Sequence, residues 1–470
     1  MIERNCTKKG LGYMQVSPCQ KISTAAFTFF SAWMISFPYE GLVLYYLAAK
    51  RHIVIGSWMQ ASIILLIVGL LSGIFVRSLE FAKQVLLTSG LLCFLGSIAL
   101  FFAPPSWWVA ILLTLAFCEG LWISSWGWFF RDCTPKGERL RSASSYLAYS
   151  ALLMIMVNLL TTRLFVIAGF ALSCALLLTS LALIYRIPVK ELQTKETEID
   201  HTEPLGVSLV VLLCGFIFVI SINSGLMFAV VNPAFAHLTG IIDWYWAVPY
   251  IVAIFLIPRL PKSIDRMYIL YVALAMLGLS FLAFMSLGRN ATDYFIINTL
   301  LLAACGINDL FWWTLLGELL NFTRNPAQLL GIGLTANLGG ILFGELLSEN
   351  SVFAGSDFYT SILGLFVVCI SLFILPLLLT SISKRLLQND SRTQDSLKED
   401  RNYAVAVEEF AALSKRENQI AQLLLKGYTR QLIANELAIS ETTVKTHIHN
   451  IYLKLEISSK TELIQKIHHS

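Results

Sequence analysis

Charged residues are scarce in most of this chain. Only 14% of its 470 residues are charged, against about 25% in an ordinary globular protein. Positions 1–380 hold 21 Lys/Arg and 19 Asp/Glu, whereas the 90 positions from 381 to 470 hold 13 and 11. The charge density therefore more than doubles near residue 381. Because 56% of the residues are hydrophobic, the composition excludes a single soluble globular domain.

Metal-binding spacings are also lacking. The nine cysteines include no C-x-x-C pair, and no His spacing resembles a zinc site. Six cysteines lie inside apolar runs, where Cys packs as a small hydrophobe. These are Cys93, Cys118, Cys174, Cys214, Cys305 and Cys369. We therefore expect no metal site. The overall hypothesis for the chain also includes no cofactor and no enzyme activity.

Long hydrophobic runs fill the first 380 residues. A bilayer core about 30 Å thick needs about 20 apolar residues per helix. Twelve segments meet this rule, which predicts an all-α bundle of twelve spans. They lie near 22–49, 53–76, 84–103, 107–130, 142–162, 164–185, 205–231, 241–258, 267–287, 294–320, 329–350 and 358–380.

The distribution of Lys and Arg predicts the orientation of the bundle. In this arrangement, the N-tail (1–21), the alternate loops and the two residues after the last span carry 19 Lys/Arg. The opposite loops carry four, namely Lys50, Arg51, Arg163 and Arg289. Cytoplasmic loops are enriched in Lys and Arg. Both termini are therefore expected in the cytoplasm, with the chain in the inner membrane of the cell.

A polar, acid-rich central loop (187–204) separates the halves 22–186 and 205–380. Two six-helix halves with a charged central loop resemble the major facilitator superfamily. The resemblance is architectural and covers residues 20–380. The family's signature loop after the second helix is hardly recognisable in the segment Gly73–Glu80. This departure argues against a transport cycle.

The C-terminal part shows helices with marked starts. Residues 381–412 form a polar linker with a short helix expected near 403–410; a flexible chain of this length spans roughly 30 Å. Residues 413–470 are predicted to form a four-helix domain, with Gly427 ending the first helix. Hydroxyl side chains that can cap first-turn N–H groups mark its helix starts. These are Ser414 (with Glu417), Thr429 and Ser459 (with Glu462), and a short turn over 438–440 leads to the third helix.

The third of these helices has two unlike faces. Val444, Ile448, Ile451 and Leu455 recur at spacings of four, three and four, which predicts a buried stripe. The opposite face offers hydrogen-bonding side chains suited to base edges and phosphates. It carries Glu441, Thr442, Lys445, Thr446 and His449. Any soluble helix has a polar face, so the pattern alone leaves DNA binding and a solvated surface both open.

Residue identities at these positions resemble the LuxR-type DNA-binding signature over residues 413–466. The matching positions are Leu413-Ser-x-Arg416-Glu417, Gly427, Ile433-Ala434-x-x-Leu437, Ser440-x-x-Thr443-Val444-Lys445-x-His447 and Ile451-x-x-Lys454-Leu455. The resemblance implies a helix-turn-helix that binds double-stranded DNA, with Lys445, Thr446 and His449 facing bases. The full set of implied DNA contacts is Thr429, Ser440, Thr442, Thr443, Lys445, Thr446, His449 and Lys454.

The same resemblance implies a homodimer through the fourth helix, at Leu463, Ile464 and Ile467. Residues 413–470 hold eight Lys/Arg and five Asp/Glu, a net charge of +3. A monomer this weakly basic binds DNA poorly at physiological salt. Two positions depart from the signature: Glu456 replaces a Gly and Lys460 replaces an Arg. We expect Glu456 to strain the end of the third helix.

Two acids lie in the middle of predicted spans. Glu119 in the fourth span and Asp309 in the tenth are each followed three residues later by a Trp. Ionisable residues at membrane depth are usually functional, and in a facilitator-like fold these two spans flank a central cavity. A pocket for a cationic or aromatic small molecule is therefore predicted. Its residues are Glu119, Trp122, Trp126, Asn223, Asp309 and Trp312.

A structural alternative for these residues stays open. The acids could be protonated, or hydrogen-bonded across helices to Asn158, Asn308 or hydroxyl groups, and the Trp side chains could serve packing alone.

Taken together, the sequence predicts a membrane-anchored, one-component transcriptional regulator. In this hypothesis the membrane domain binds an unknown small molecule and changes how the C-terminal domain binds DNA. Two alternatives remain: a working transporter with a fused regulatory domain, and a membrane anchor coupled to a partner protein.

Overall fold

The computed structural model describes the chain over the following ranges, and the statements below concern these residues. They are 18–39, 41–54, 58–189, 206–261, 264, 266–349, 357–408, 413–425, 428–437, 439–460 and 462–463. Within these ranges the chain forms helices and no strand. It divides into two compact units, Met1–Leu379 and Thr380–Ser470, which are described separately.

The first half of the membrane unit contains six long helices and several short ones. In chain order they are α1 (Pro18–Ser36), α2 (Leu42–Lys50), α3 (Trp58–Leu71), η1 (Ser72–Phe75), α4 (Leu79–Phe102), α5 (Pro105–Cys133), η2 (Lys136–Glu138), α6 (Arg139–Arg163) and α7 (Val166–Arg186).

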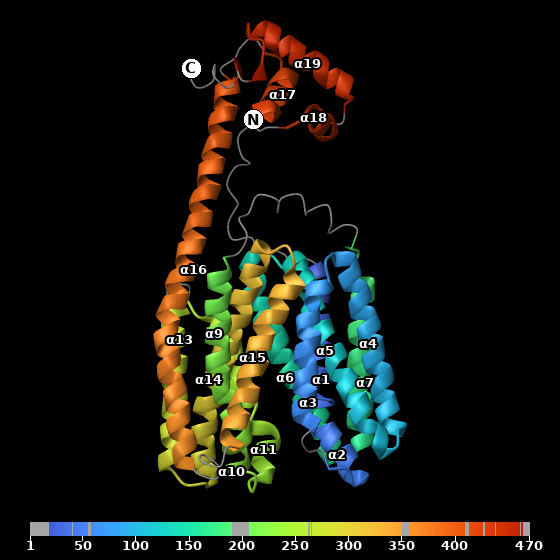
Figure 1. The fold of residues 1–470 in the computed structure, drawn as a ribbon, viewed down its shortest axis with the longest axis vertical. Coiled ribbons are helices and arrows are strands. Elements are labelled where there is room, and N and C mark those ends of the chain that lie inside the picture. The colour runs from blue at the N-terminus through green and yellow to red at the C-terminus, as the bar shows by residue number, and fades with distance from the viewer. Residues whose placement is uncertain are drawn as a thin grey trace, which may run out of the picture. The chain divides into compact units, whose positions relative to one another are not determined.

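The second half repeats this series with more interruptions. Its elements are α9 (Val207–Leu226), η4 (Met227–Val231), α10 (Asn232–Ala234), α11 (Thr239–Tyr245), α12 (Val248–Leu256), η5 (Ile257–Arg259), α13 (Arg266–Ser286), α14 (Ala291–Leu319), η6 (Leu320–Phe322), α15 (Pro326–Glu349) and α16 (Asp357–Glu408). Figure 1 shows these membrane helices lined up side by side.

All twelve predicted spans contain helix, but the count of twelve crossings is not confirmed. In the described ranges, nine helical stretches are long and apolar enough to cross a membrane. The other three predicted spans, 22–49, 53–76 and 241–258, are divided into shorter helices. The first is broken after Ser36, where Pro38 cannot continue the hydrogen-bond ladder of a helix. The chain is nevertheless a multi-pass membrane protein.

Helix pairing repeats between the two halves. In the first half α5 packs against α3 and α4, and α1 against α6; in the second half α14 packs against α12 and α13, and α9 against α15. These three pairs of the first half each have a counterpart six spans later. This internal repeat is the arrangement of a facilitator-like bundle, as the sequence predicts.

Two seams join the halves. In one, α15 lies against α3 and α5 at backbone distance: a Cβ on Gly331 would stand 2.2 Å from the carbonyl oxygen of Leu70. In the other, α6 lies against α12 and α14, and side chains meet there. Examples are the Tyr149 and Phe255 rings, whose centroids are 5.6 Å apart, and the Ser144 hydroxyl, which donates to the carbonyl oxygen of Ile254 at 2.9 Å.

A buried arginine also links the halves, at the ends predicted to face the cytoplasm. Arg139, the first residue of α6, is 1% exposed and donates to the carbonyl oxygen of Gly317 and to Asn321 Oδ1, the latter at 2.9 Å. It also donates to the carbonyl oxygens of Arg131 and Thr134, both at 3.4 Å. We call Arg139, Gly317 and Asn321 the inter-half latch.

The part of the predicted linker that the structure describes, 381–408, is helical. Helix α16 continues to Glu408, where the sequence suggested an irregular connector with one short helix. Neither Pro nor Gly occurs between Pro376 and Gly427, so no residue with strong helix-breaking preference ends the helix. Residues 409–412 lie outside the described ranges, as do most of the N-tail and the central loop 190–204.

The C-terminal unit contains α17 (Lys415–Leu425), α18 (Arg430–Glu436) and α19 (Glu441–Lys454). Lys460, Glu462 and Leu463 are also helical and fit the start of the predicted fourth helix. The three helices enclose their own hydrophobic core, to which Leu413, Ile420, Leu424, Ile433, Val444, Ile448, Ile451, Leu455 and Leu463 contribute. The predicted stripe of the third helix is confirmed by this core.

Candidate DNA-binding face and candidate ligand site

The turn between α18 and α19 is built by capping hydroxyls. Thr429 accepts a hydrogen bond from the backbone N–H of Leu432 at 3.3 Å and begins α18. Ser440 accepts from the N–H of Thr443 at 3.1 Å and begins α19, and the Ser440 and Thr443 hydroxyls lie 2.7 Å apart. The Thr429 cap was predicted, whereas for Ser440 the sequence predicted only a turn before the helix. The two caps commit Thr429, Ser440 and Thr443 to local structure, although their positions at helix starts remain exposed.

Helix α19 presents the predicted polar face to the surface of the unit. Lys445, Thr446 and His449 are exposed, as are Glu441 and Thr442. On the other side of the helix Val444 and Ile451 have no exposed surface. An exposed helix face with hydrogen-bonding side chains has the geometry that base-edge readout requires.

Lys454 occupies a different environment from the other predicted contacts. Its ammonium group donates to Glu417 Oε2 at 2.7 Å, joining α19 to α17. Glu417 also completes the predicted capping box: its carboxylate accepts from the N–H of Ser414 at 2.7 Å, and its own N–H donates to the Ser414 hydroxyl at 3.3 Å. The hydrogen bond from Lys454, ahead of those from Ser414, lowers the pKa of Glu417 to about 2.

The residues predicted to form the dimer contact are only partly described. Leu463 has no exposed surface and belongs to the core of its own unit, so its side chain is not on the surface where a second copy would dock. Ile464 and Ile467 lie outside the described residues. The homodimer therefore stays a prediction.

Two features of this unit escaped the sequence reasoning. Arg416 donates to the carbonyl oxygen of Leu437 at 2.7 Å and so fixes the end of α18 against α17. Arg430 is an exposed cation directly after the Thr429 cap; its place beside a predicted contact was the available signal.

In the membrane unit, Asp309 is held by two donors. The Tyr250 hydroxyl of α12 donates to Asp309 Oδ2 at 3.0 Å, and the Trp312 indole N–H donates to Oδ1 at 3.1 Å. Asn158 and Asn308, the amide partners left open by the sequence, do not take part; the Asn308 amide instead donates to the carbonyl oxygen of Ala304. The carboxylate is therefore positioned by side chains of α12 and α14.

An aromatic network connects the Trp residues of the two halves. Trp122 stacks on Phe30 with ring centroids 3.7 Å apart, and Trp126 lies 4.1 Å from Phe27. The network reaches the second half through Trp313, which lies 5.6 Å from Phe27 and is stacked on Trp312 at 5.2 Å. Tyr146 of α6 contacts Phe27, Trp126 and Trp313. The structure thus brings Trp122, Trp126 and Trp312 into one connected set.

Glu119 and Asn223 are not connected to this set by any described contact. Glu119 is 1% exposed, and its Oε1 has no hydrogen-bond partner among the described residues. The Trp122 indole N–H likewise has no acceptor there, so the Glu119 pair does not repeat the Asp309–Trp312 hydrogen bond. Asn223 is also buried, and neither of its amide atoms has a partner in the described chain.

A cavity lies elsewhere in the first half. It has a volume of about 620 Å³ and opens between α1 and α6. Polar and charged groups, including Lys21, Glu138 and Arg141, line one part of it, and apolar groups such as Phe29 and Met156 line another. None of the six predicted pocket residues lines this cavity.

Comparison with known proteins agrees with this division. A family model described as "Bacterial regulatory proteins, luxR family" matches residues 411–467. Response regulator protein TodT of Pseudomonas putida is 47% identical over 58 residues, which are 12% of this chain and 26% of TodT. HTH-type transcriptional regulator MalT of Yersinia pestis is 44% identical over 54 residues, 12% of this chain and 6% of MalT. The chain thus spans about a quarter or less of the length of these relatives.

The membrane unit is similar in fold to solved transporters. The human organic anion transporter MFSD10 superposes with a TM-score of 0.60 at 12% identity, over 76% of this chain and 100% of that chain. The proton:xylose symporter XylE gives a TM-score of 0.56 at 14% identity, over 77% and 94%. At these identities the likeness concerns the fold alone. Residues 411–467 are therefore a luxR-family helix-turn-helix domain, carried by a chain whose membrane domain has the major facilitator fold.

Proposed function

We propose that this protein is a membrane-anchored transcriptional regulator whose membrane domain binds a small molecule and thereby changes DNA binding by the C-terminal domain. It acts as a non-enzymatic, one-component sensor in the inner membrane, with both termini in the cytoplasm. It binds double-stranded DNA as a homodimer.

The exposed face of α19 supports the DNA-binding half of this proposal. Among the described residues, no hydrogen bond or ion pair engages the side chain of Lys445 or His449, and the Thr446 hydroxyl donates only to the carbonyl oxygen of Thr442 in its own helix. TodT and MalT, which match this region, are named as regulators.

The observation that carries the sensing half is the placement of Asp309. Its carboxylate lies beside a network of rings that runs from α5 through α1 and α6 to α14. A cationic or aromatic ligand is attracted by carboxylates and by ring faces. Such a ligand, bound at Asp309, would contact residues of both halves and would favour the arrangement of the halves that it fits better.

Topology is the first test. Reporter fusions that end after Ser383 and after Gly288, in the loop between α13 and α14, should be active on opposite sides, with the Ser383 fusion in the cytoplasm. An external Ser383 fusion would contradict the regulator proposal, because DNA lies in the cytoplasm.

A second experiment tests sensing and separates it from the alternatives. RNA sequencing with and without the gene, repeated across cationic and aromatic small molecules, should identify an inducer. That inducer should raise the melting temperature of the purified full-length protein. If the inducer does not raise the melting temperature of the protein, a membrane anchor coupled to a partner protein is favoured. If the compound accumulates in proteoliposomes that contain the protein, a transporter is favoured.

A further inference from the structure

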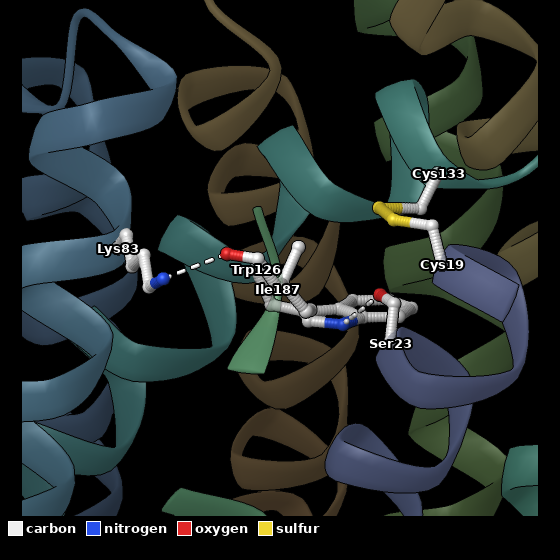
Figure 2. Close-up of a disulfide and its surroundings, with 6 residues drawn as sticks. All are labelled: Cys19, Ser23, Lys83, Trp126, Cys133 and Ile187. Atoms are coloured by element: carbon white, nitrogen blue, oxygen red, sulfur yellow. Dashed lines mark hydrogen bonds between the residues drawn. A yellow bond between two sulfur atoms is a disulfide. The ribbon is translucent and has the colours of Figure 1, made fainter. Parts of the chain in front are cut away.

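A disulfide joins the start of α1 to the end of α5. It links Cys19 to Cys133, whose Cα atoms are 5.4 Å apart although 114 residues separate them in the sequence. This distance lies in the usual range for a bridge. Figure 2 shows the bridge close to Ser23, whose hydroxyl accepts a hydrogen bond from the Trp126 indole at 3.1 Å. The sequence reasoning did not pair these cysteines.

A disulfide at the cytoplasmic side of a membrane protein is unusual, and that is the side on which this bridge is predicted to lie. The end of α5 leads into the short connection that contains Lys136, Arg139 follows at the start of α6, and Lys21 follows Cys19 by two residues. These basic residues place the bridge at the cytoplasmic side, a step that rests on the proposed function. Disulfides are rare in the reducing cytosol, and those that form there are usually transient and catalytic or redox-sensing. A permanent structural bridge would not be expected to persist here.

The contacts around Cys133 connect the bridge to the second half. Cys133 lies between Arg131 and Thr134, whose carbonyl oxygens both accept from the Arg139 guanidinium. The same guanidinium forms the inter-half latch with Gly317 and Asn321. Closing or opening the bridge therefore restrains or releases the segment that positions the latch.

The Cys19 end of the bridge is attached to the beginning of α6, the helix that starts at Arg139. Gln20, next to Cys19, donates to the Ser142 hydroxyl of α6 at 3.0 Å. Cys19 is the second residue of α1 and is partly exposed, whereas Cys133 is 3% exposed. The positive end of a helix dipole favours a thiolate. Cys19 is thus the thiol that a small oxidant reaches first.

We propose that Cys19 and Cys133 form a reversible dithiol that reports oxidation by a hydroperoxide to the regulator. The Cys19 thiolate attacks the O–O bond, forming a sulfenic acid and releasing water or an alcohol. The Cys133 thiol then attacks that sulfur, forming the S–S bond and releasing water. Two thiols are oxidised by two electrons and one hydroperoxide is reduced. A cellular thiol reductant reverses the step by thiol–disulfide exchange.

The test follows both thiols and transcription in cells that make the full-length protein. Cells are exposed to hydrogen peroxide, quenched with acid and alkylated, and the Cys19 and Cys133 peptides are quantified by mass spectrometry. Both thiols should react with the alkylating agent in unstressed cells and should not react after peroxide treatment. Dithiothreitol added after the peroxide should make both reactive again. Regulated transcripts should change with the same time course.

The variants separate signalling from folding. Cys19→Ser and Cys133→Ser should each lose the transcriptional response to peroxide while accumulating in the membrane like wild type. The control Cys369→Ser, which alters an exposed free thiol on α16, should respond like wild type. Alanine substitutions at Cys19 and Cys133 should give the same result as serine.

Three outcomes would overturn the proposal: a bridge already closed at rest that dithiothreitol does not open, thiols that stay alkylated throughout, or transcription that is unmoved while the bridge cycles. None of these depends on the inducer. If the bridge does not cycle but the protein still responds to the inducer, the redox proposal fails and the proposed function is unaffected. If the Ser383 fusion is active outside the cytoplasm, the proposed function fails whatever the thiols do.

Discussion

The indole N–H of Trp312 donates to Asp309, one helical turn earlier, at 3.1 Å, whereas the indole N–H of Trp122, at the same offset from Glu119, has no acceptor among the described residues. The two acid-x-x-Trp sequences are therefore alike in spacing and different in bonding. Asp309 is already occupied by donors from two helices, and Glu119 has an oxygen that remains available.

Asp309→Asn and Glu119→Gln should each leave transcription at one level whether or not the inducer is present. Both variants keep the size of the side chain and remove its charge. Losing a charge-assisted hydrogen bond costs about 1.5–3 kcal/mol, which matches the 1–3 kcal/mol typical of coupling between two sites. The measurement is the dose–response of a regulated promoter at matched protein levels.

Asp293→Asn, at the other end of α14, is the matched control and should respond like wild type. If both Asp309→Asn and Glu119→Gln also respond like wild type, the acids are structural and the ligand binds elsewhere. The cavity between α1 and α6 would then be the next candidate. A loss confined to Asp309→Asn would limit the site to the second half.

Replacing Lys445, Thr446 and His449 together by Ala should abolish specific DNA binding without unfolding the C-terminal domain, because all three side chains are exposed. Lys445→Ala alone should cost about 1–3 kcal/mol if the lysine contacts a base, and should mainly flatten the salt dependence if it contacts a phosphate. The measurement is a titration of a selected duplex at several salt concentrations. Equal binding by the triple variant and by the control Glu436→Ala would show that another face binds DNA.

Glu417→Gln should destabilise a fragment of residues 400–470 at neutral pH by about 1–2 kcal/mol, since a hydrogen bond to a charged group is lost and the exposed Lys454 is partly screened by solvent. The folded-state pKa of Glu417, about 2, lies below its ordinary value of 4.5. The carboxylate therefore contributes its stability fully above pH 4.5 and loses it as the pH falls towards 2. Urea unfolding at several pH values should show wild type and variant converging in acid. A difference that is independent of pH would contradict this assignment.

Glu456→Gly should stabilise the same fragment by about 1 kcal/mol. A non-glycine residue in the left-handed region costs roughly 1–2 kcal/mol, and glycine avoids this cost. Part of the gain is offset because glycine gives the unfolded chain more conformational entropy. Glu456 has a φ of 53°. It ends α19 in a Schellman arrangement, in which the N–H of Ile457 donates to the carbonyl oxygen of Tyr452 at 2.9 Å. For a domain of this size the gain corresponds to a rise in melting temperature of about 4–8 °C. Glu456→Ala, which removes the side chain but keeps a Cβ, should show no such rise.

Local signals in the sequence predicted local structure well. The caps at Ser414 and Thr429 and the buried stripe of α19 follow from spacings of three or four residues, and the structure has all of them. The strain at Glu456 was expected from a single departure from the family signature, and the positive φ confirms the position.

Relationships between distant segments were not accessible in this way. Tyr250 was one apolar residue in the eighth span, and only packing of α12 on α14 makes it the partner of Asp309. The Cys19–Cys133 bridge likewise depends on α1 and α5 meeting at one end. The continuation of α16 was missed because a polar composition suggested a linker, although positions 381–408 contain neither Pro nor Gly.

The difference between the two seams of the membrane domain has a mechanical consequence. Where α15 meets α3 and α5, backbone lies directly on backbone, as Gly331 shows against Leu70 and Gly127 against Pro326. At these positions no side chain lies between the helices that could change rotamer when one helix slides along the other. Where α6 meets α12 and α14, rings and hydroxyls form the contact, and these can exchange partners. A rotation of one half against the other therefore costs least when α15 serves as the hinge. The contact that changes is then the aromatic seam, on the side where Tyr146 meets Trp313.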